Sequence, residues 1–360
     1  MSGRAQFLNF VRSSVNGTRM APHGRLDQTK AFDAAPLRFR RGALVRAAQQ
    51  VSHRNGESQH KAAAAEGVSR LADERVMAYE GLSGEDFRHP LDQQNTSFLQ
   101  MLPGLESLAK GFMGPVAEQV LLLENIGTSI RVSEDQMPSV HALLMEACQV
   151  LGMEAPELYI RQNSQPNAYT LAISGRKPFI VMHTSLLELL TPAELQVVIA
   201  HELGHLKCDH GLWLTVANML ASGAVSILPV ISSTLEEGLL RWLRAAELTC
   251  DRAALLVAQD AKTVVSALMK LAGGSPSFAH ELNVDAFLKQ ARSYDEATSS
   301  PLGWYLRNAQ NRALSHPLPV MRAREIDRWA QSAQYRALLS KNRKFRRNGS
   351  SPSRQAVNMS

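Results

Sequence analysis

The stretch that most constrains this chain is residues 191–211, TPAELQVVIAHELGHLKCDHG. Its centre, HELGH, places His201 and His205 four residues apart, so both lie on one face if the segment is a helix. Two imidazole nitrogens on one face can bind a single metal ion. Glu202, next to the first histidine, can reach a water molecule on that metal. The segment therefore predicts a metal-binding helix.

The ends and sides of this helix are also predictable. Thr191 is a suitable N-cap, Pro192 suits the first helical position, and Glu194 completes a capping box. Gly211 is a natural C-terminal stop. The uncharged approach over residues 197–200 predicts a buried helix. The HExxH pattern is used by zinc peptidases, but it is short, and a buried helix with two hydrogen-bonded histidines is the alternative.

A third metal ligand is expected because catalytic zinc sites have three protein ligands and leave the fourth position to water. The candidate is Glu247, in the segment RAAELTCDRAAL of residues 244–255. Asp251 follows one turn later and can hold the outer nitrogen of a ligand histidine. Such a pair usually marks a solvated helix face, but here it lies among alanines, leucines and a cysteine. We therefore interpret Glu247 as a ligand and Asp251 as its supporting carboxylate.

HELGH followed by ExxxD resembles metallopeptidase family 48, the HtpX-like and CAAX-prenyl-protease-like zinc endopeptidases. The resemblance covers about residues 150–330. It is supported by QPNAYTLAISG, IVMHTSLLELLTPAEL and SHPLPVMRAREI. The segment AELTCDRAALLVAQD is most similar to the plastid-type members of plants and algae. The resemblance implies one Zn²⁺ per chain, held by His201, His205 and Glu247, with Glu202 as the general base.

The expected fold is α+β and mainly α-helical. The resemblance implies a zincin-like (gluzincin) metallopeptidase domain with a small antiparallel sheet beside the HExxH helix. Residues 158–161 predict a short strand, and residues 168–173 and 179–182 predict a β-hairpin. In zinc peptidases an edge strand beside the metal helix often pairs with the extended substrate.

The family resemblance implies further site residues on both sides of the metal helix. Asn167, Ala168 and Tyr169 match a substrate-binding strand segment, although a purely structural hairpin is an equal alternative. His316 matches a His-Pro segment near the zinc, where it would act in catalysis. Arg322, with Arg324 as the alternative, would bind the substrate backbone or the oxyanion.

The net charge of +6 comes from the ends of the chain. Residues 1–50 carry +7 and residues 341–360 carry +6, which leaves about −7 for the middle and no basic surface for nucleic acid. Residues 1–48 are rich in Arg and poor in acids, as in an organelle transit peptide. We predict a plastid location, with the mitochondrion and a merely disordered tail as alternatives.

The domain organisation follows from these composition shifts. After the transit peptide of residues 1–48, residues 49–110 predict a mostly disordered polar linker. Residues 111–340 predict the zinc metallopeptidase domain, and residues 341–360 a basic disordered tail.

Residues 212–231 contain no charge over twenty positions, which is the length of a membrane span. One full crossing would separate His205 from Glu247, which must meet at one zinc. We therefore expect a buried or membrane-leaning helical pair. A membrane hairpin is the alternative, so the protein could be soluble or membrane-associated. The sequence does not predict the oligomeric state.

Three cysteines, Cys148, Cys208 and Cys250, have no paired spacing and indicate a reducing compartment. Cys208 and Cys250 lie close in sequence to the predicted ligands and could bind zinc in principle. Because two histidines and a glutamate already complete a catalytic set, we interpret the cysteines as buried thiols.

The leading hypothesis is a zinc-dependent metalloendopeptidase that hydrolyses peptide bonds in protein substrates, in organellar protein quality control or processing. The alternative is a zinc-stabilised binding or assembly protein without turnover. A zinc hydrolase of non-peptide substrates is a third hypothesis. The intact base and ligand set favour an enzyme.

Overall fold

The computed structural model describes the chain from residue 79 to residue 340 with gaps. The described residues are 79, 81–101, 122–123, 125–171, 177–211, 213–214, 229–312, 314 and 316–340. All belong to one compact unit. The predicted transit peptide, the basic tail and most of residues 212–231 lie outside the described residues. No helix within the described residues is long and apolar enough to cross a membrane.

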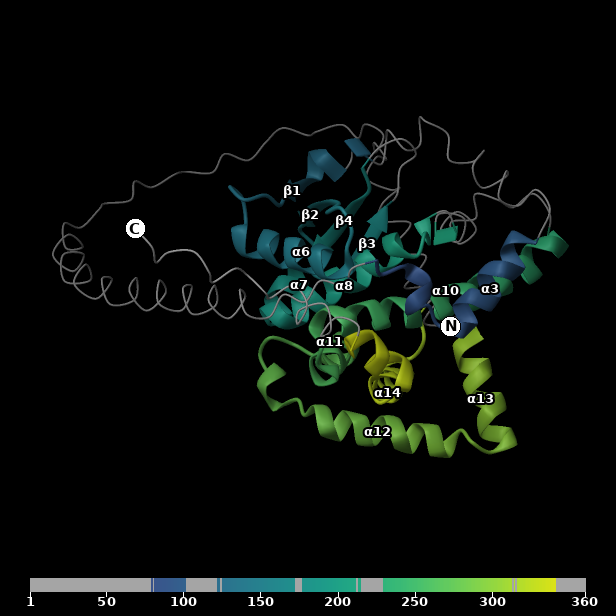
Figure 1. Ribbon diagram of the computed structural model, residues 1–360. Helices are drawn as coiled ribbons and strands as arrows, with labels where there is room; N and C mark the ends of the chain where they lie inside the picture. The colour runs from purple at the N-terminus through teal and green to yellow at the C-terminus, as the bar shows by residue number, and fades with distance from the viewer. Residues whose placement is uncertain are drawn as a thin grey trace, which may run out of the picture. The chain divides into compact units, whose positions relative to one another are not determined.

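A four-stranded sheet in the order β1-β2-β4-β3 forms one side of the domain (Figure 1). Its strands are β1 (Ser129–Arg131), β2 (Glu157–Arg161), β3 (Ala168–Leu171) and β4 (Phe179–His183). The predicted hairpin is confirmed, because β3 pairs antiparallel with β4. The sheet is mixed rather than wholly antiparallel, since β2 runs parallel to β4. That pairing is possible because β3 occupies only one edge of β4 and leaves the other to β2.

Helices account for most of the rest, as predicted. They are α3 (Pro90–Gln100), α6 (Pro138–Leu151), α7 (Thr184–Leu189), α8 (Pro192–Lys207), α10 (Pro229–Ala258), α11 (Ala261–Gly273), α12 (Val284–Ala297), α13 (Pro301–Arg312) and α14 (Pro319–Ala330), with short 3-10 turns at Gly84–Asp86 and Ala279–Glu281. Helix α8 is central: it contacts β3 and α6, and also α10 and α11 (Figure 1). Helix α14 packs on α10, α11 and α12. The HELGH segment is therefore enclosed by the fold.

Helix α8 begins as the sequence predicts. The Thr191 hydroxyl accepts a hydrogen bond from the Glu194 amide, and the Glu194 carboxylate accepts one from the Thr191 amide at 2.8 Å. The helix ends at Lys207, four residues before the predicted stop at Gly211. Asp209 adopts a left-handed conformation with φ of 54°, which a short polar side chain tolerates. This turn brings the chain back toward α8.

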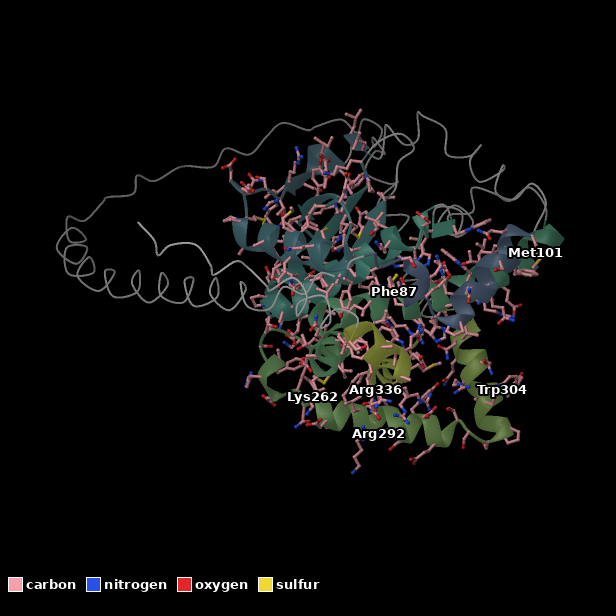
Figure 2. All side chains as sticks on the ribbon, viewed as in Figure 1. Phe87, Met101, Lys262, Arg292, Trp304 and Arg336 are labelled. Atoms are coloured by element: carbon pink, nitrogen blue, oxygen red, sulfur yellow. The ribbon has the colours of Figure 1, made fainter. Side chains whose placement is uncertain are left out.

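Residues 81–101 correct the predicted boundary of the linker. We expected them to belong to a mostly disordered segment of residues 49–110, but they form a 3-10 turn and helix α3, which packs against α10. Phe87 is fully buried, and it lies inside the domain in Figure 2. In contrast, Met101 at the end of α3 and Trp304 of α13 are exposed (Figure 2). The segment is mostly polar, so its sequence did not indicate that a few buried residues, such as Phe87 and Leu99, attach it to the domain.

Candidate metal centre and active site

Two histidines of α8 converge on one carboxylate of α10. Nε2 of His201 lies 3.4 Å from Glu247 Oε2, and Nε2 of His205 lies 3.4 Å from Glu247 Oε1. His205 and Glu247 are buried, and the His201 side chain is only 12% exposed. The three side chains predicted to be metal ligands therefore meet at one place, although they come from positions 46 residues apart in the sequence.

The donor set fits a metal ion. Oε2 of Glu247 is buried and has no hydrogen bond of good geometry among the described residues. His316, Arg322 and His201 lie 2.8, 3.3 and 3.4 Å from this oxygen, and a bound metal ion would give it a direct bond. Ligand atoms of His201, His205 and Cys250 also lie within 4.8 Å of one another, so the thiol is a further ligand candidate. The Cys250 sulfur lies 3.8 Å from Nδ1 of His210, which in turn faces Nδ1 of His205. The thiol thus also faces His210, the neighbour of the outer nitrogen of His205.

Asp251 and Arg322 support His201. Nδ1 of His201 lies 3.1 Å from Asp251 Oδ1, which is the contact that the ExxxD pattern predicts. Arg322 of α14 donates to both Asp251 oxygens, at 2.8 and 2.6 Å, and lies 3.3 Å from Glu247 Oε2. We predicted that Arg322 binds substrate. Its largely buried side chain contacts Asp251 and Glu247, where a forked donor fixes a carboxylate in place.

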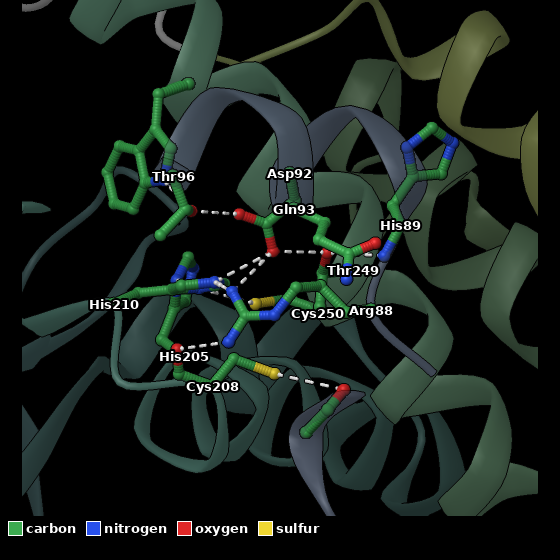
Figure 3. A network of polar contacts seen from close by, with 12 residues as sticks. Arg88, His89, Asp92, Gln93, Thr96, His205, Cys208, His210, Thr249 and Cys250 are labelled. Atoms are coloured by element: carbon green, nitrogen blue, oxygen red, sulfur yellow. Dashed lines mark hydrogen bonds and ion pairs between the residues drawn. The ribbon is translucent and has the colours of Figure 1, made fainter. Parts of the chain in front are cut away.

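His205 has a different support, which the sequence analysis did not find. Its Nδ1 lies 3.2 Å from Nδ1 of His210, and Nε2 of His210 lies 3.0 Å from Oδ2 of Asp92 in α3 (Figure 3). The turn after α8 positions His210, whose amide donates to the His205 carbonyl at 2.9 Å. A third histidine five residues after the motif was the available signal. Nothing in the sequence pointed to Asp92.

Glu202 occupies the inner side of α8 beside the sheet. Its Oε2 accepts a 2.7 Å hydrogen bond from the hydroxyl of Thr170 in β3. The carboxylate is 7% exposed, so Thr170 supplies much of its polar environment. A carboxylate that is held next to paired metal ligands can take a proton from water and return it to a leaving group.

Strand β3 is the outer strand of the described sheet, next to this carboxylate. The Asn167 carbonyl accepts from the His183 amide, and Tyr169 pairs with Val181. In an antiparallel ladder the intervening residue, Ala168, therefore directs its main-chain groups to the open edge. The side chain of Tyr169 lies on the sheet face opposite to Thr170, with its hydroxyl 3.2 Å from Asn125 Oδ1. Tyr169 is thus not directed at Glu202.

His316 lies at the same site, as the sequence predicted. Its Nδ1 is 2.8 Å from Glu247 Oε2, and its side chain is 62% exposed. The alternative arginine, Arg324, forms ion pairs with Asp295 and Asp327 instead. Among the two arginines, only Arg322 belongs to the site.

The ionisable groups of the centre shift one another's pKa values. Burial lowers the pKa of His201, but Glu247 and Asp251 outweigh burial and raise that pKa to about 10. Burial raises the pKa of Glu247, yet His316, His201 and Arg322 hold it well below its usual value. Burial also raises the pKa of Asp251, but Arg322 and His201 outweigh it. Both carboxylates are therefore ionised, and their negative charge surrounds the ligand histidines.

A buried helix with an HExxH motif and a glutamate ligand candidate on a neighbouring helix defines the site as that of a metallopeptidase. Comparison with known proteins agrees. The model of Peptidase family M48 matches residues 134–330, and the chain belongs to this family. It is a metalloprotease.

Relatives support the same assignment. Plastoglobule-localized metallopeptidase 48, chloroplastic, of Arabidopsis thaliana is 65% identical over 272 residues, which are 74% of this chain and 79% of the relative. Protease HtpX homolog 2 of Methanosarcina mazei is 29% identical, over 42% of this chain and 61% of the relative. The protein of the same name from Methanosarcina acetivorans is 28% identical, over 39% and 58%. No solved structure gave a significant match.

Proposed function

We propose that this metallopeptidase is a zinc endopeptidase whose ion is held by His201, His205 and Glu247. The observation that supports the proposal most directly is the convergence of both Nε2 atoms on the Glu247 carboxylate, at 3.4 Å each. Two imidazoles and one carboxylate are a common ligand set of catalytic zinc. Cys250 is not part of the proposed set, because Glu247 already lies 3.4 Å from both Nε2 atoms, and the Cys250 thiol faces His210 at 3.8 Å.

The bound ion would lower the pKa of a water molecule and polarise the carbonyl of the peptide bond. Glu202 is the proposed general base: its carboxylate takes a proton from the attacking water and passes that proton to the leaving amine. Thr170 holds the carboxylate in place for both transfers. His316, exposed and next to Glu247, is the proposed donor to the developing oxyanion.

We propose that the substrate is an extended protein segment that pairs with the open edge of β3. Ala168 is the proposed main-chain partner, because the ladder directs its amide and carbonyl outward. Asn167 and Tyr169 contribute through the shape of the strand, since the Asn167 carbonyl and the Tyr169 hydroxyl already have partners inside the fold. Main-chain pairing recognises unfolded segments with little sequence preference, which suits protein quality control or processing.

A plastid is the proposed location. Residues 1–48 have the composition of a transit peptide. The Arabidopsis relative, at 65% identity, is named as chloroplastic and plastoglobule-localized. We propose that this chain has the same organelle and association.

The deciding experiment compares the zinc-loaded protein with its Glu202→Gln variant on casein, an unfolded substrate. We expect cleavage by the first only, with one zinc bound by each. Equal cleavage by both would contradict the assignment of Glu202 as the base. If neither cleaves while both bind zinc, and removal of the zinc unfolds both, the zinc-stabilised assembly protein becomes the better hypothesis.

A further inference from the structure

The two ligand histidines are supported in different ways. His201 contacts a carboxylate, Asp251, directly through Nδ1. Nδ1 of His205 instead faces the imidazole of His210, and the two ring centroids lie 5.3 Å apart. His210 is 1% exposed, so its ring must find its hydrogen-bond partners within the protein.

The far nitrogen of His210 reaches Asp92, whose side chain is completely buried. Oδ2 of Asp92 also accepts from Thr249 at 2.7 Å and from Arg88 at 3.1 Å, while Oδ1 accepts from Thr96 at 3.0 Å (Figure 3). Asp92 is therefore a carboxylate that only accepts hydrogen bonds.

The direction of each hydrogen bond follows from that carboxylate. Because Asp92 only accepts, Nε2 of His210 carries hydrogen. One hydrogen lies between the two Nδ1 atoms, which are 3.2 Å apart. If it belonged to His210, that buried ring would be a cation, at a high desolvation cost and next to Arg88. It therefore belongs to His205, which leaves the lone pair of His205 Nε2 facing Glu247.

We propose that Asp92 and His210 are positioning residues that fix the tautomer and orientation of His205 for metal binding. The inference rests on the ligand set proposed above. It places α3 in the metal site, although Asp92 lies outside the residues 134–330 that the family model matches. Each of the two carboxylates accepts a hydrogen bond from an arginine: Asp251 from Arg322, and Asp92 from Arg88.

The test measures the zinc dissociation constant of full-length variants by competition with a chelator. We expect His210→Phe to raise the constant about 10- to 100-fold, the usual effect of losing an outer partner of a ligand histidine. Asn places an oxygen near the position of Nδ1, so His210→Asn should restore part of the affinity. Asp92→Asn keeps the shape of Asp92 but can also donate, so it should weaken binding by an intermediate factor.

A matched control separates orientation of the ligand from packing of α3. Thr96→Val removes the donor to Oδ1 of Asp92 and the acceptor for the Trp242 indole, but leaves the Oδ2 contact with His210. We expect its zinc affinity to stay within about twofold of the wild type, with lower thermal stability of the metal-free protein. Cobalt absorption spectra should change in the His210 variants and not in Thr96→Val, because they report ligand geometry.

The results separate this inference from the proposed ligand set. Unchanged zinc affinity in His210→Phe and Asp92→Asn, with His205→Ala unable to bind, would overturn the positioning role and leave the ligands intact. An equal loss of affinity in Thr96→Val would also overturn it, because packing alone would explain the effect. Full zinc affinity in both His205→Ala and Glu247→Gln would instead contradict the ligand set itself.

Discussion

Thr170 donates a 2.7 Å hydrogen bond to Oε2 of Glu202 and lies 3.3 Å from the Glu202 carbonyl oxygen. One hydroxyl therefore ties strand β3 to helix α8 at the residue proposed as the general base. The same strand offers the open main-chain edge. The strand proposed to pair with the substrate and the proposed base are thus linked by one side chain.

We expect Thr170→Val to lower kcat for casein about 10- to 100-fold, because a hydrogen bond to a charged group contributes about 1.5–3 kcal/mol. The main chain that pairs with substrate is unchanged, so KM should stay within about twofold. Steady-state kinetics of the zinc-loaded protein measures both quantities. Thr170→Ser keeps the hydroxyl and should retain most of the activity. Full activity in Thr170→Val would show that the hydroxyl has no part in holding the base.

Gly204 lies between His201 and His205 in the sequence and allows α8 and α10 to approach closely. A Cβ at this position would lie 3.0 Å from the Cα of Cys250 and 3.0 Å from the Cβ of Ala253. We expect Gly204→Ala to destabilise the protein by about 1–3 kcal/mol, as overpacking usually does. It should also weaken zinc binding, because Glu247 shifts with α10.

Gly238→Ala is the matched control for this substitution. It lies in α10, and the nearest described atom to its added Cβ is Cε1 of Phe98 at 4.0 Å. Both changes gain the same helix propensity, so Gly238→Ala should stabilise the protein by about 0.5–1 kcal/mol. Urea unfolding of both variants measures the difference. If Gly204→Ala and Gly238→Ala stabilised the protein equally, the close packing of α8 on α10 would not require a glycine at position 204.

Zinc content distinguishes Glu247 from Cys250 as the third ligand. We expect Glu247→Gln to lose the ion during dialysis against a mild chelator, because a neutral amide is a much weaker ligand than a carboxylate. Cys250→Ala should keep one zinc per chain, since the proposed ligand set does not include its sulfur, which faces His210. Elemental analysis after dialysis measures both. Zinc retained in Glu247→Gln and lost from Cys250→Ala would reverse the assignment.

Local chemistry explains why part of this site was predictable. The capping box at Thr191 and the one-turn spacing of His201 and His205 are short-range rules, and the structure has both. The contact of Asp251 with His201 was also predictable, because ExxxD places both carboxylates on one face of a helix.

The remaining features depend on distant packing. Asp92 lies 118 positions before His210, in a polar segment whose composition suggested a disordered linker. A single buried carboxylate cannot be recognised there, because its partners come from a turn after α8 and from α10. The contacts of Arg322 could not be predicted for the same reason, because they depend on where α14 packs. The parallel pairing of β2 with β4 was not predicted either, since the order of strands depends on the packing of the whole sheet.

The last prediction concerns stability against pH and uses a buried ion pair away from the metal centre. Oε2 of Glu194 accepts from Lys270 at 2.6 Å, and Oε1 accepts from Ser266 at 2.6 Å. Burial raises the pKa of Glu194, but Lys270, Ser266 and Thr191 outweigh it and keep the pKa below 4.5. Because the folded pKa lies below the unfolded one, ionised Glu194 stabilises the protein fully above about pH 4.5, and this contribution is lost as pH falls through the folded pKa.

We therefore expect Glu194→Gln to cost about 3 kcal/mol of unfolding free energy at pH 7, as removal of one partner from a buried pair does. The difference from the wild type should shrink below about pH 4.5, where the wild type begins to lose its own carboxylate charge. Urea unfolding between pH 7 and pH 3.5 measures it. Glu188→Gln changes an exposed glutamate of α7 and should have little effect at any pH. A difference for Glu194→Gln that stayed constant or grew on acidification would show that its charge does not stabilise the fold.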